Sequence, residues 1–303
     1  MEALSVSSYQ SLARIGHEKR WRSPRGTVIL PKGFVDSRRL RSVVLQVRRI
    51  QANRYGNLEL RTSCCINANK GSKDLPSCVD EALILKMKSA DVLPYLNQRC
   101  IYLVGMMGSG KTTIGKILSE VLGYSFYDSD KLVEQATGLS SVAEIFKEHN
   151  EDFFRDTESN ILKDLSSMKR LGVGTGGGAV IRPINWRYMK QGISVWLDVP
   201  LEALAKRIAA VGTESRPLLD NENGDPYTKA LIRLSALSGE RGDAYANADA
   251  RVCLQHVATE QGHGDVLALT PAAIATEALV QIESFLIQAS EVERLNIPEG
   301  LRR

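Results

Sequence analysis

A glycine-rich segment in the middle of the chain has the residue types needed to hold phosphate groups. It runs from Gly105 to Thr112, fits the pattern G-x4-G-K-[ST], and joins an apolar run to a helical pattern. Its glycines allow backbone N–H groups to turn towards phosphate oxygens, and the positive end of a helix beginning near Lys111 favours the same anion. Lys111 would neutralise charge on the β- and γ-phosphates, and Thr112 can ligate Mg²⁺. The segment predicts a phosphate site, and a glycine-rich turn that binds nothing is the alternative.

Two carboxylates follow the next β-like run along the chain. Asp128 and Asp130 come at the end of the run Tyr124 to Tyr127, so we expect both at the carboxyl edge of a sheet. One carboxylate of such a pair can face metal-bound water while the other faces a substrate hydroxyl. A solvated loop is the alternative for a motif this short.

Three arginines and a run of glycines complete the set of candidate residues. Arg155 stands beside phenylalanines and acidic residues, where a surface ion pair worth about 0 to 1 kcal/mol is the plain alternative. Gly176 to Gly178 close a third β-like run and allow a ligand to approach the main chain, although a tight turn has the same composition. Arg216 lies in a polar segment that could be a mobile lid, and Arg241 is a cation that periodicity does not explain.

The spacing of apolar residues predicts the elements that must position these side chains. Alternation of strand and helix indicates a parallel sheet covered on both faces. Further helices are expected at Glu81 to Ala90 and at Ala273 to Ile287. The β-like runs lie at residues 100–104, 124–127, 171–173, 193–197 and 250–254.

Charge is distributed unevenly along the 303 residues. The net charge is +4, but the first 70 residues hold 14 Lys and Arg against 4 Asp and Glu, so the remainder is mildly acidic. A nucleic-acid site needs basic residues on the folded part, and here they lie in an arm without helical or strand periodicity. No run approaches the roughly 18 consecutive apolar residues of a membrane span. We therefore expect neither nucleic acid nor membrane as a partner.

The N-terminal arm has the composition of an organelle import signal. Residues 1–65 are rich in arginine and serine and poor in acids, and they lack the compact apolar region of a secretory signal. We expect removal near Arg61 to Cys65, and the alternative is a basic tail that stays attached. Five cysteines without paired or metal-ligand spacing indicate a reducing compartment.

These segments together resemble shikimate kinase, of the nucleoside-monophosphate-kinase-like group of P-loop proteins. The resemblance covers residues from about 98 to 290, where GMMGSGKTT, FYDSD, the FFR segment, TGGGAV, SRPLL and ER followed four residues later by Tyr occur in the family's order. It implies a three-layer α/β/α P-loop kinase fold with a five-stranded parallel sheet in the order 2-3-1-4-5, plus a mobile lid. The corresponding limits are a disordered chloroplast transit peptide at 1–65, an N-terminal extension at 66–97, the kinase domain at 98–290 and a frayed tail at 291–303.

The resemblance also implies an activity, which is transfer of a phosphoryl group from ATP, with Mg²⁺, to the 3-hydroxyl of shikimate. It implies a plant enzyme of the plastid stroma whose arm is recognised by the import machinery, and it leaves the oligomeric state open. Asp130 would bind the ring hydroxyls and orient or deprotonate the 3-hydroxyl, while Arg155 and Arg241 would clamp the carboxylate. These roles suit the residues, because a planar guanidinium matches a carboxylate.

The implied site residues fall into four groups. The catalytic set is Lys111, Asp130 and Arg216, the last as the lid arginine. The acceptor site adds Gly176, Gly177 and Gly178 to Asp130, Arg155 and Arg241, and the metal site is Thr112 and Asp128. The nucleotide site is Gly105, Met106, Met107, Gly108, Ser109, Gly110, Lys111, Thr112 and Thr113, with Arg207 as the candidate for stacking on adenine.

Two departures from the family's pattern and two rival functions stay open. Residues 220–225 look inserted compared with compact bacterial members, which leaves the timing of the lid open. Gln255 to Pro271, where the family places an adenine-contacting loop, is long and lacks an arginine.

The rivals are a kinase of another hydroxylated small acid, such as gluconate, and a non-catalytic paralogue. A paralogue of that kind would be expected to lose one of the residues Lys111, Asp130, Arg155 and Arg241, and all four are present.

Overall fold

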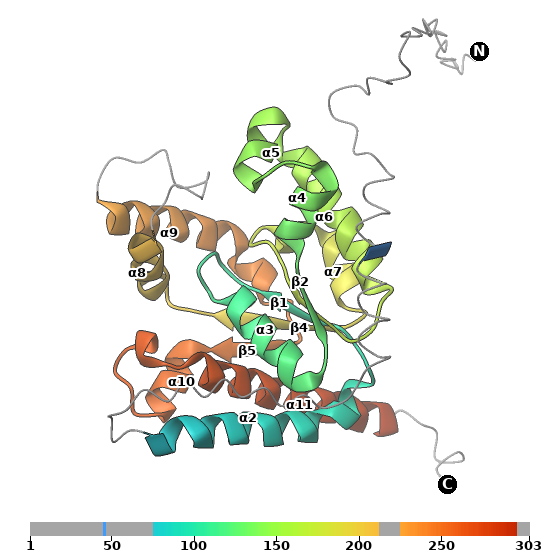
Figure 1. Ribbon diagram of the computed structural model, residues 1–303, viewed down its shortest axis with the longest axis vertical. Helices are drawn as coiled ribbons and strands as arrows, with labels where there is room; N and C mark the ends of the chain where they lie inside the picture. Colours follow the sequence, from blue (N-terminus) through green and yellow to red (C-terminus); the bar gives the residue numbers. More distant parts are fainter. Residues whose placement is uncertain (1–44, 47–74, 212–224, 296–303) are drawn as a thin grey trace, which may run out of the picture. The chain divides into compact units, whose positions relative to one another are not determined.

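The computed structural model describes residues 45–46, 75–211 and 225–295 of the chain. Its centre is a five-stranded sheet with helices around it (Figure 1). The strand order is β2-β3-β1-β4-β5, and all neighbouring strands are parallel. The fold class and strand order predicted from the sequence are therefore confirmed. The strands are β1 (Ile101–Val104), β2 (Ser125–Asp128), β3 (Leu171–Gly174), β4 (Ile193–Asp198) and β5 (Ala250–Cys253).

The helices follow the strands in alternation, as the apolar spacing predicts. Side chains cap several of them: Asn150 Oδ1 accepts a hydrogen bond of 2.9 Å from the N–H of Phe153 at the start of α6. The helices are α2 (Leu75–Leu96), α3 (Lys111–Leu122), α4 (Ser129–Thr137), α5 (Val142–Glu148), α6 (Glu151–Ser166), α7 (Pro183–Met189), α8 (Leu201–Val211), α9 (Pro226–Tyr245), α10 (Leu254–Glu260) and α11 (Pro271–Leu295), with short 3-10 turns η1 (Ala179–Ile181) and η3 (Val266–Ala268).

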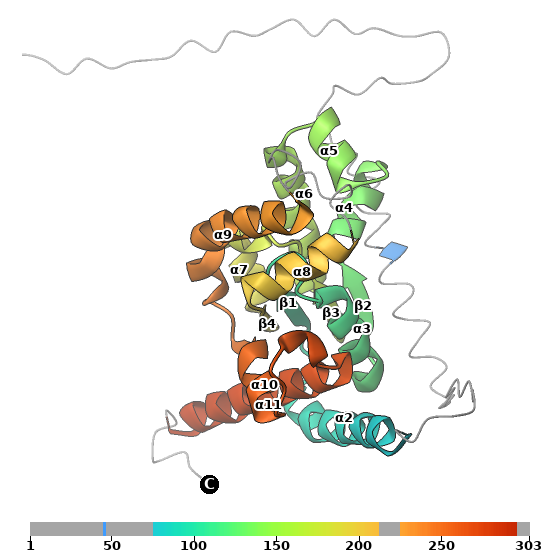
Figure 2. The same cartoon turned by 90° about the vertical axis from the view of Figure 1, so that its left-hand side faces the viewer.

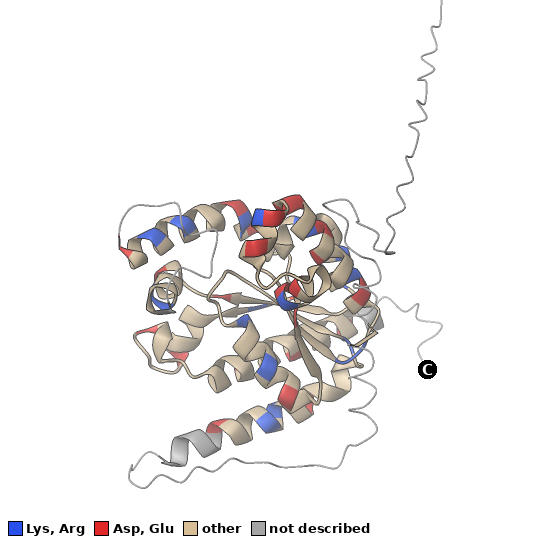
Figure 3. Ribbon diagram, turned by 45° about the horizontal axis from the view of Figure 1, so that its top comes forward, with Lys and Arg blue, Asp and Glu red and all other residues tan. Residues whose placement is uncertain are grey.

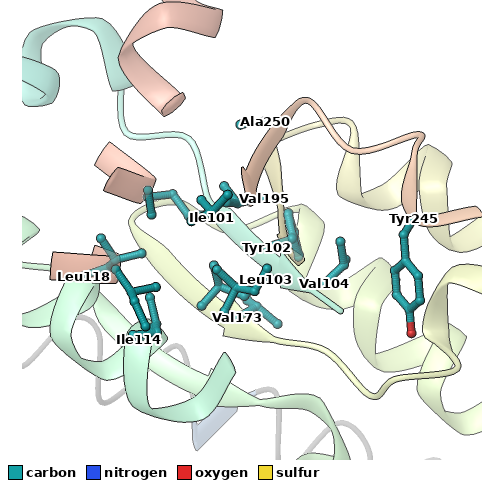
Figure 4. Packing of buried hydrophobic residues seen from close by; sticks show 14 of the residues in the cluster. Ile101, Tyr102, Leu103, Val104, Ile114, Leu118, Val173, Val195, Tyr245 and Ala250 are labelled. Carbon is teal, nitrogen blue, oxygen red and sulfur yellow. The ribbon is translucent and has the colours of Figure 1, made fainter. Parts of the chain in front are cut away.

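The central strand β1 is buried along its whole length, which explains why its sequence is apolar without alternation. It pairs with β3 on one side and β4 on the other. Figure 4 shows its Ile101 and Leu103 among apolar side chains of neighbouring strands and of α3. The helix approaches the sheet so closely that a side chain at Gly172 of β3 would overlap the hydroxyl of Ser119.

The carboxyl ends of β1, β2 and β3 lie at one edge of the sheet because the three strands are parallel. The segment Gly105 to Thr112, called the phosphate loop below, follows β1. Asp128 ends β2, and Gly176 to Gly178, called the glycine run, follow β3. The strands are mostly uncharged, and the acidic and basic residues lie on the helices and at the strand ends (Figure 3). Candidate residues from three distant stretches of sequence therefore meet at this edge.

The helix before the first strand belongs to the same core as the sheet. It is longer than the predicted Glu81 to Ala90, and it lies along α11 in both views (Figures 1 and 2). Its Leu85, Val92 and Leu96 are buried members of the apolar core. The segment assigned to an N-terminal extension thus contributes, from α2 onwards, to the folding unit itself.

The last helix differs from its prediction at both ends. It begins at Pro271 and continues to Leu295, whereas the predicted helix runs from Ala273 to Ile287. No glycine or proline interrupts the sequence between Ala272 and Leu295, and the helix continues for that reason.

Helix α11 is also apolar enough to resemble a membrane span. Among the described helices it alone, over Pro271–Val292, has the length and composition to cross a membrane. Its Ala275, Leu279 and Ile282 are completely buried in the core, however, and it contacts β4 and β5. Its apolar character is that of a core helix.

Replacing a buried residue of α2 should destabilise the whole domain. Leu96→Ala is expected to lower the free energy of unfolding by about 2 to 5 kcal/mol, because Leu96 is fully buried and its removal leaves a cavity. Leu83→Ala, on the same helix but 55% exposed, should change that free energy by less than about 0.5 kcal/mol. Urea denaturation measures both free energies. A change for Leu96→Ala as small as that for Leu83→Ala would place α2 outside the cooperative unit.

Candidate active site

The phosphate loop and the start of α3 form one wall of a cavity of about 600 Å³. Gly108 and Gly110 adopt left-handed backbone conformations, with φ of 79° and 94°, that directly precede the helix. From the predicted nucleotide site the wall takes Gly108, Ser109, Gly110, Lys111, Thr112, Thr113 and Arg207, and it adds Ile114, Ala210, Leu269, Pro271 and Ile274. The last three come from the long segment before α11 and from its first turn, which the sequence analysis had left without a contact residue.

The first three residues of the motif do not line this cavity. Gly105 has φ of 146°, and a Cβ there would lie 2.8 Å from the carbonyl oxygen of Leu197, so this position requires glycine. Met106 is a buried core residue. The Lys111 amine donates to the carbonyl oxygens of Gly105 and Met106, at 2.8 Å each. Gly105 and Met106 therefore shape the loop, and their carbonyl oxygens hold the Lys111 amine in place.

Thr112 and Asp128 lie together beside the phosphate loop. The Thr112 hydroxyl donates to Oδ2 of Asp128 at 2.9 Å. Oδ1 of Asp128 accepts from the N–H of Asp130 at 3.1 Å and thereby caps α4. The described residues contain no group of three or more His, Cys, Asp and Glu side chains suited to a metal ion. A threonine hydroxyl and a carboxylate are nevertheless the kind of oxygen ligands that Mg²⁺ uses together with phosphates and water.

Asp130 stands in the first turn of α4 with one oxygen buried. Within the described part of the chain, its Oδ1 has no hydrogen-bond partner. Burial raises the pKa of this carboxyl to about 7, and the negative charges of Glu158 and Asp128 add to the effect. Lys111 and Arg155 act in the opposite direction. A carboxyl with such a pKa can exchange a proton near neutral pH, as a general base must.

Arg155 is not a surface arginine, so the plain alternative of an exposed ion pair is wrong. Its side chain is 9% exposed, and Nη1 donates to Oε2 of Glu158 at 2.8 Å. A second bond of 3.1 Å runs from Nη2 to the half-exposed Glu151. Glu158 is completely buried, and desolvation raises its pKa against the opposing effect of Arg155. Glu158 was not among the residues predicted from the sequence, although its spacing of three residues from Arg155 on a helix indicates a pair with that arginine.

The glycine run accommodates these charged side chains. A Cβ at Gly176 would lie 2.5 Å from Oδ1 of Asp130 and 2.6 Å from Oε1 of Glu158, and one at Gly178 would overlap the Arg155 guanidinium. None of the three glycines has a left-handed φ. Close approach of side chains, rather than the conformation of a tight turn, therefore explains why glycine is required here.

The last turns of α9 bring a second buried arginine to the same glycines. Arg241 is 5% exposed, and its Nη1 lies 3.8 Å from the point where a Cβ on Gly177 would stand. One turn later, Tyr245 donates from its hydroxyl to the carbonyl oxygen of Gly177 at 2.6 Å. Burial raises the pKa of Tyr245 to about 12, so the hydroxyl stays protonated and remains a donor. Figure 4 shows this tyrosine beyond Val104, at the carboxyl end of β1.

The structure thus gathers two neighbouring groups of predicted residues. Lys111, Thr112 and Asp128 lie at the phosphate loop, while Asp130, Arg155 and Arg241 surround the glycine run. The predicted lid arginine, Arg216, lies outside the described residues, as do residues 220–224 of the apparent insertion.

Comparison with known proteins gives consistent matches. A sequence model of the family described as shikimate kinase matches residues 107–282. "Shikimate kinase 2, chloroplastic" of Oryza sativa subsp. japonica is 68% identical over 226 residues, which are 75% of this chain and 74% of the rice protein. "Shikimate kinase, chloroplastic" of Solanum lycopersicum is 50% identical over 293 residues, covering 94% of this chain and 97% of the tomato protein.

A solved structure agrees with these sequence matches. Shikimate kinase from Acinetobacter baumannii, in complex with shikimate, is 32% identical to this chain and superposes with a TM-score of 0.51. The superposition covers 66% of this chain and 99% of the bacterial one. The match of the family model extends from the phosphate loop past Asp130, Arg155 and Arg241, and the chain belongs to the shikimate kinase family.

Proposed function

We propose that the protein transfers the γ-phosphoryl group of ATP to the 3-hydroxyl of shikimate, giving shikimate 3-phosphate and ADP. One observation carries this proposal: two buried arginines and a buried carboxylate surround a glycine run directly beside the phosphate loop. Glu158 and Glu151 pair with Arg155, but Arg241 forms no ion pair within the described part of the chain. Its burial is costly without an anion, and shikimate supplies a carboxylate together with ring hydroxyls.

The acceptor site would bind the carboxylate of shikimate through Arg155 and Arg241. A guanidinium donates two parallel hydrogen bonds to a carboxylate, which fixes the orientation of the acid as well as neutralising its charge. Gly176, Gly177 and Gly178 would line this site, and the absence of a side chain at 176 and 178 lets Asp130 and Arg155 lie against the main chain. Asp130 would accept a hydrogen bond from the reacting hydroxyl, because its buried Oδ1 has no partner in the described part of the protein.

The nucleotide would occupy the cavity beside the loop. Its phosphate oxygens would accept hydrogen bonds from the backbone N–H groups at the start of α3. The Lys111 amine would move from the loop carbonyl oxygens to the phosphate oxygens. Arg207 and the apolar Leu269 and Pro271 line the remaining wall, which suits the flat face of a purine. This wall is our proposal for the adenine site.

Magnesium fits the donor set at Thr112 and Asp128. The hydroxyl and the carboxylate would hold the ion directly or through water, and the bound ion would neutralise charge on the phosphate groups. The hydrogen bond between the two side chains keeps both oxygens at the phosphate loop.

Catalysis would then depend on positioning and on charge neutralisation. The acceptor oxygen attacks the γ-phosphorus in line, the bond to the oxygen of ADP breaks, and the hydroxyl proton passes to the Asp130 carboxylate. Lys111 disperses the negative charge on the transferring group, and Arg216 remains the predicted lid cation for the same purpose.

We also propose that the protein acts in the chloroplast stroma after import. The rice and tomato relatives are named chloroplastic, and the basic, serine-rich composition of residues 1–65 is that of an import signal. Cleavage near Arg61 to Cys65 would remove the arm and leave α2, which begins at Leu75, intact. The import machinery would be the partner of the arm.

Release of ADP should depend on shikimate. A coupled assay with ATP and Mg²⁺ is expected to record ADP formation with shikimate and no more than background with gluconate or other sugar acids. Lys111→Ala, which removes the phosphate-binding amine, should abolish the signal and serves as the control. Equal rates with gluconate would assign the site to a different acid, and no ADP with any acceptor would favour a non-catalytic paralogue.

Removing either buried arginine should weaken shikimate selectively. Arg155→Ala and Arg241→Ala are each expected to raise the KM for shikimate roughly 10- to 100-fold, since each loses a charge-assisted contact, with little change in the KM for ATP. Arg251→Ala is the exposed control, because the Arg251 side chain is 59% exposed and pairs with Asp198. Unchanged shikimate KM values in both buried variants would reject the clamp.

Asp130→Asn should lower the turnover and raise the folding stability at neutral to basic pH. Turnover is expected to fall far more than ATP affinity, because the amide cannot accept the hydroxyl proton. The pKa of Asp130 is about 7 in the folded protein against 3.8 for a free side chain, so the folded state binds more protons and its stability falls as pH rises through this range.

The asparagine side chain does not titrate, so the Asp130→Asn variant does not lose this stability as the pH rises. It should therefore be more stable than the parent at about pH 8, and the difference should shrink as the pH is lowered towards about 5. Urea denaturation at the two pH values measures this, and a parent that is the more stable one at the higher pH would contradict the assignment.

A further inference from the structure

The hydroxyl of Tyr245 lies where the phosphate loop and the glycine run meet. It donates a hydrogen bond of 2.6 Å to the carbonyl oxygen of Gly177, and it lies 3.5 Å from Sδ of Met106 in the phosphate loop. Because a thioether sulfur is only a weak acceptor, the proton goes to the carbonyl oxygen and the sulfur is a close neighbour. A single side chain thus contacts both halves of the site.

The two halves also pack directly against each other at this place. A Cβ on Gly177 would lie 3.6 Å from the backbone nitrogen of Met107 and 3.7 Å from the carbonyl oxygen of Gly105. The same point lies 3.8 Å from Nη1 of Arg241. Gly177 therefore stands between the loop that would hold the phosphates and an arginine that would hold the acceptor. The position of its backbone determines how far apart the two are.

A run of three glycines needs contacts from other elements to keep its position. Glycine has more conformational freedom than any other residue, and it has no side chain to pack. Two hydroxyls supply the restraint. Ser129, at the start of α4, accepts a hydrogen bond of 2.9 Å from the N–H of Gly176, and Tyr245, at the end of α9, donates to the carbonyl oxygen of Gly177. The glycine run is thereby tied to two different helices.

The aromatic ring of Tyr245 is itself fixed against the sheet. It is 2% exposed and stacks on Trp196 of β4, with the ring centroids 5.9 Å apart and the ring planes at 16°. Trp196 aligns with Val104, the last residue of β1, which directly precedes the phosphate loop (Figure 4). The hydroxyl therefore has a set position relative to the strand from which the phosphate loop leaves.

Arg241 reaches the same hydroxyl from the preceding turn of α9. Burial raises the pKa of Tyr245 to about 12, and Arg241 opposes that rise through its charge and a hydrogen bond. The phenol oxygen accepts from the guanidinium while its own proton is donated to Gly177, since a hydroxyl does both at once. Three parts of the site thus converge on one oxygen atom, which are the phosphate loop, the glycine run and a buried arginine.

We propose that Tyr245 is a positioning residue for phosphoryl transfer: its hydroxyl fixes the spacing between the phosphate loop and the glycine run, and with it the alignment of the acceptor hydroxyl on the γ-phosphorus. This inference rests on the proposed function, because it concerns the reaction at the same site. A misplacement of about 1 Å can lower the rate of a transfer about 100-fold. A hydroxyl that only paired a buried carbonyl oxygen would affect stability and leave the products of the reaction unchanged.

Tyr245→Phe removes the hydroxyl and keeps the ring, so the stack on Trp196 and the fold should persist. With ATP, Mg²⁺ and shikimate, kcat is expected to fall about tenfold because the reacting groups are misaligned. The KM for ATP should stay at the parental value, and that for shikimate should rise no more than about threefold, because both buried arginines remain.

The products give a readout that a loss of stability does not change. The parental chain should form ADP and shikimate 3-phosphate in equal amounts. In Tyr245→Phe the ADP should exceed the shikimate 3-phosphate, because water takes the phosphoryl group when the acceptor is misaligned and inorganic phosphate is released. Partial unfolding would lower both products together and keep the amounts equal.

Tyr124→Phe is the matched control. Tyr124 is also 2% exposed, but it precedes β2, at the end of that strand opposite to Asp128. The variant loses a hydroxyl from an equally buried ring, and it should keep the parental kcat and the equal amounts of product. Parental values in Tyr245→Phe, or the same change in both variants, would overturn the inference.

Hydrogen–deuterium exchange tests the restraint without turnover, so it gives an answer whichever acid is the acceptor. In Tyr245→Phe the backbone amides of residues 175–179 should exchange at least about fivefold faster than in the parent, with no change in the amides of α2. Unchanged exchange in the glycine run would show that the hydroxyl does not hold it. A parental chain without shikimate-dependent ADP release would instead contradict the proposed function and leave the exchange result intact.

Discussion

The parallel pairing of β1 with β3 is the constraint on which the rest of the site depends. Leu103 of β1 aligns with Gly174 of β3, and the carbonyl oxygen of Leu103 accepts from both the N–H and the hydroxyl of Thr175, at 3.1 and 3.0 Å. The phosphate loop and the glycine run therefore leave the sheet side by side. Any other pairing would separate the two, and with them the proposed phosphate and acceptor sites.

Buried charge gives the proposed acceptor site its character. Arg155, Arg241 and Glu158 are all nearly or completely buried, and isolated ions would be strongly unfavourable there. The arrangement is tolerable because Arg155 and Glu158 pair with each other and because the glycine run leaves room for them. In the acceptor site that we propose, these buried charges lower stability and prepare the site for an anion with hydroxyl groups.

Local sequence determined the phosphate loop and the order of the elements. The loop is contiguous, and its glycine backbone, the Lys111 amine and the Thr112 hydroxyl lie within a few residues of one another, so the motif alone predicts a phosphate site. Strand and helix alternation determined a parallel sheet because connections between parallel strands need a crossing helix. The same patterns placed Asp130 and the glycine run at the carboxyl edge, as found.

Tertiary structure alone decided the parts that depend on contacts between distant residues. A glutamate three residues from Arg155 could equally face solvent, and only the packing of α6 against the glycine run buries Glu158. The requirement for glycine at 176 and 178 likewise comes from side chains of α4 and α6, which no local pattern reveals. Helix α2 belongs to the core because α11, almost two hundred residues later, supplies its partner surface. Burial and close approach are properties of the assembled chain, whereas a phosphate loop is a property of its own few residues.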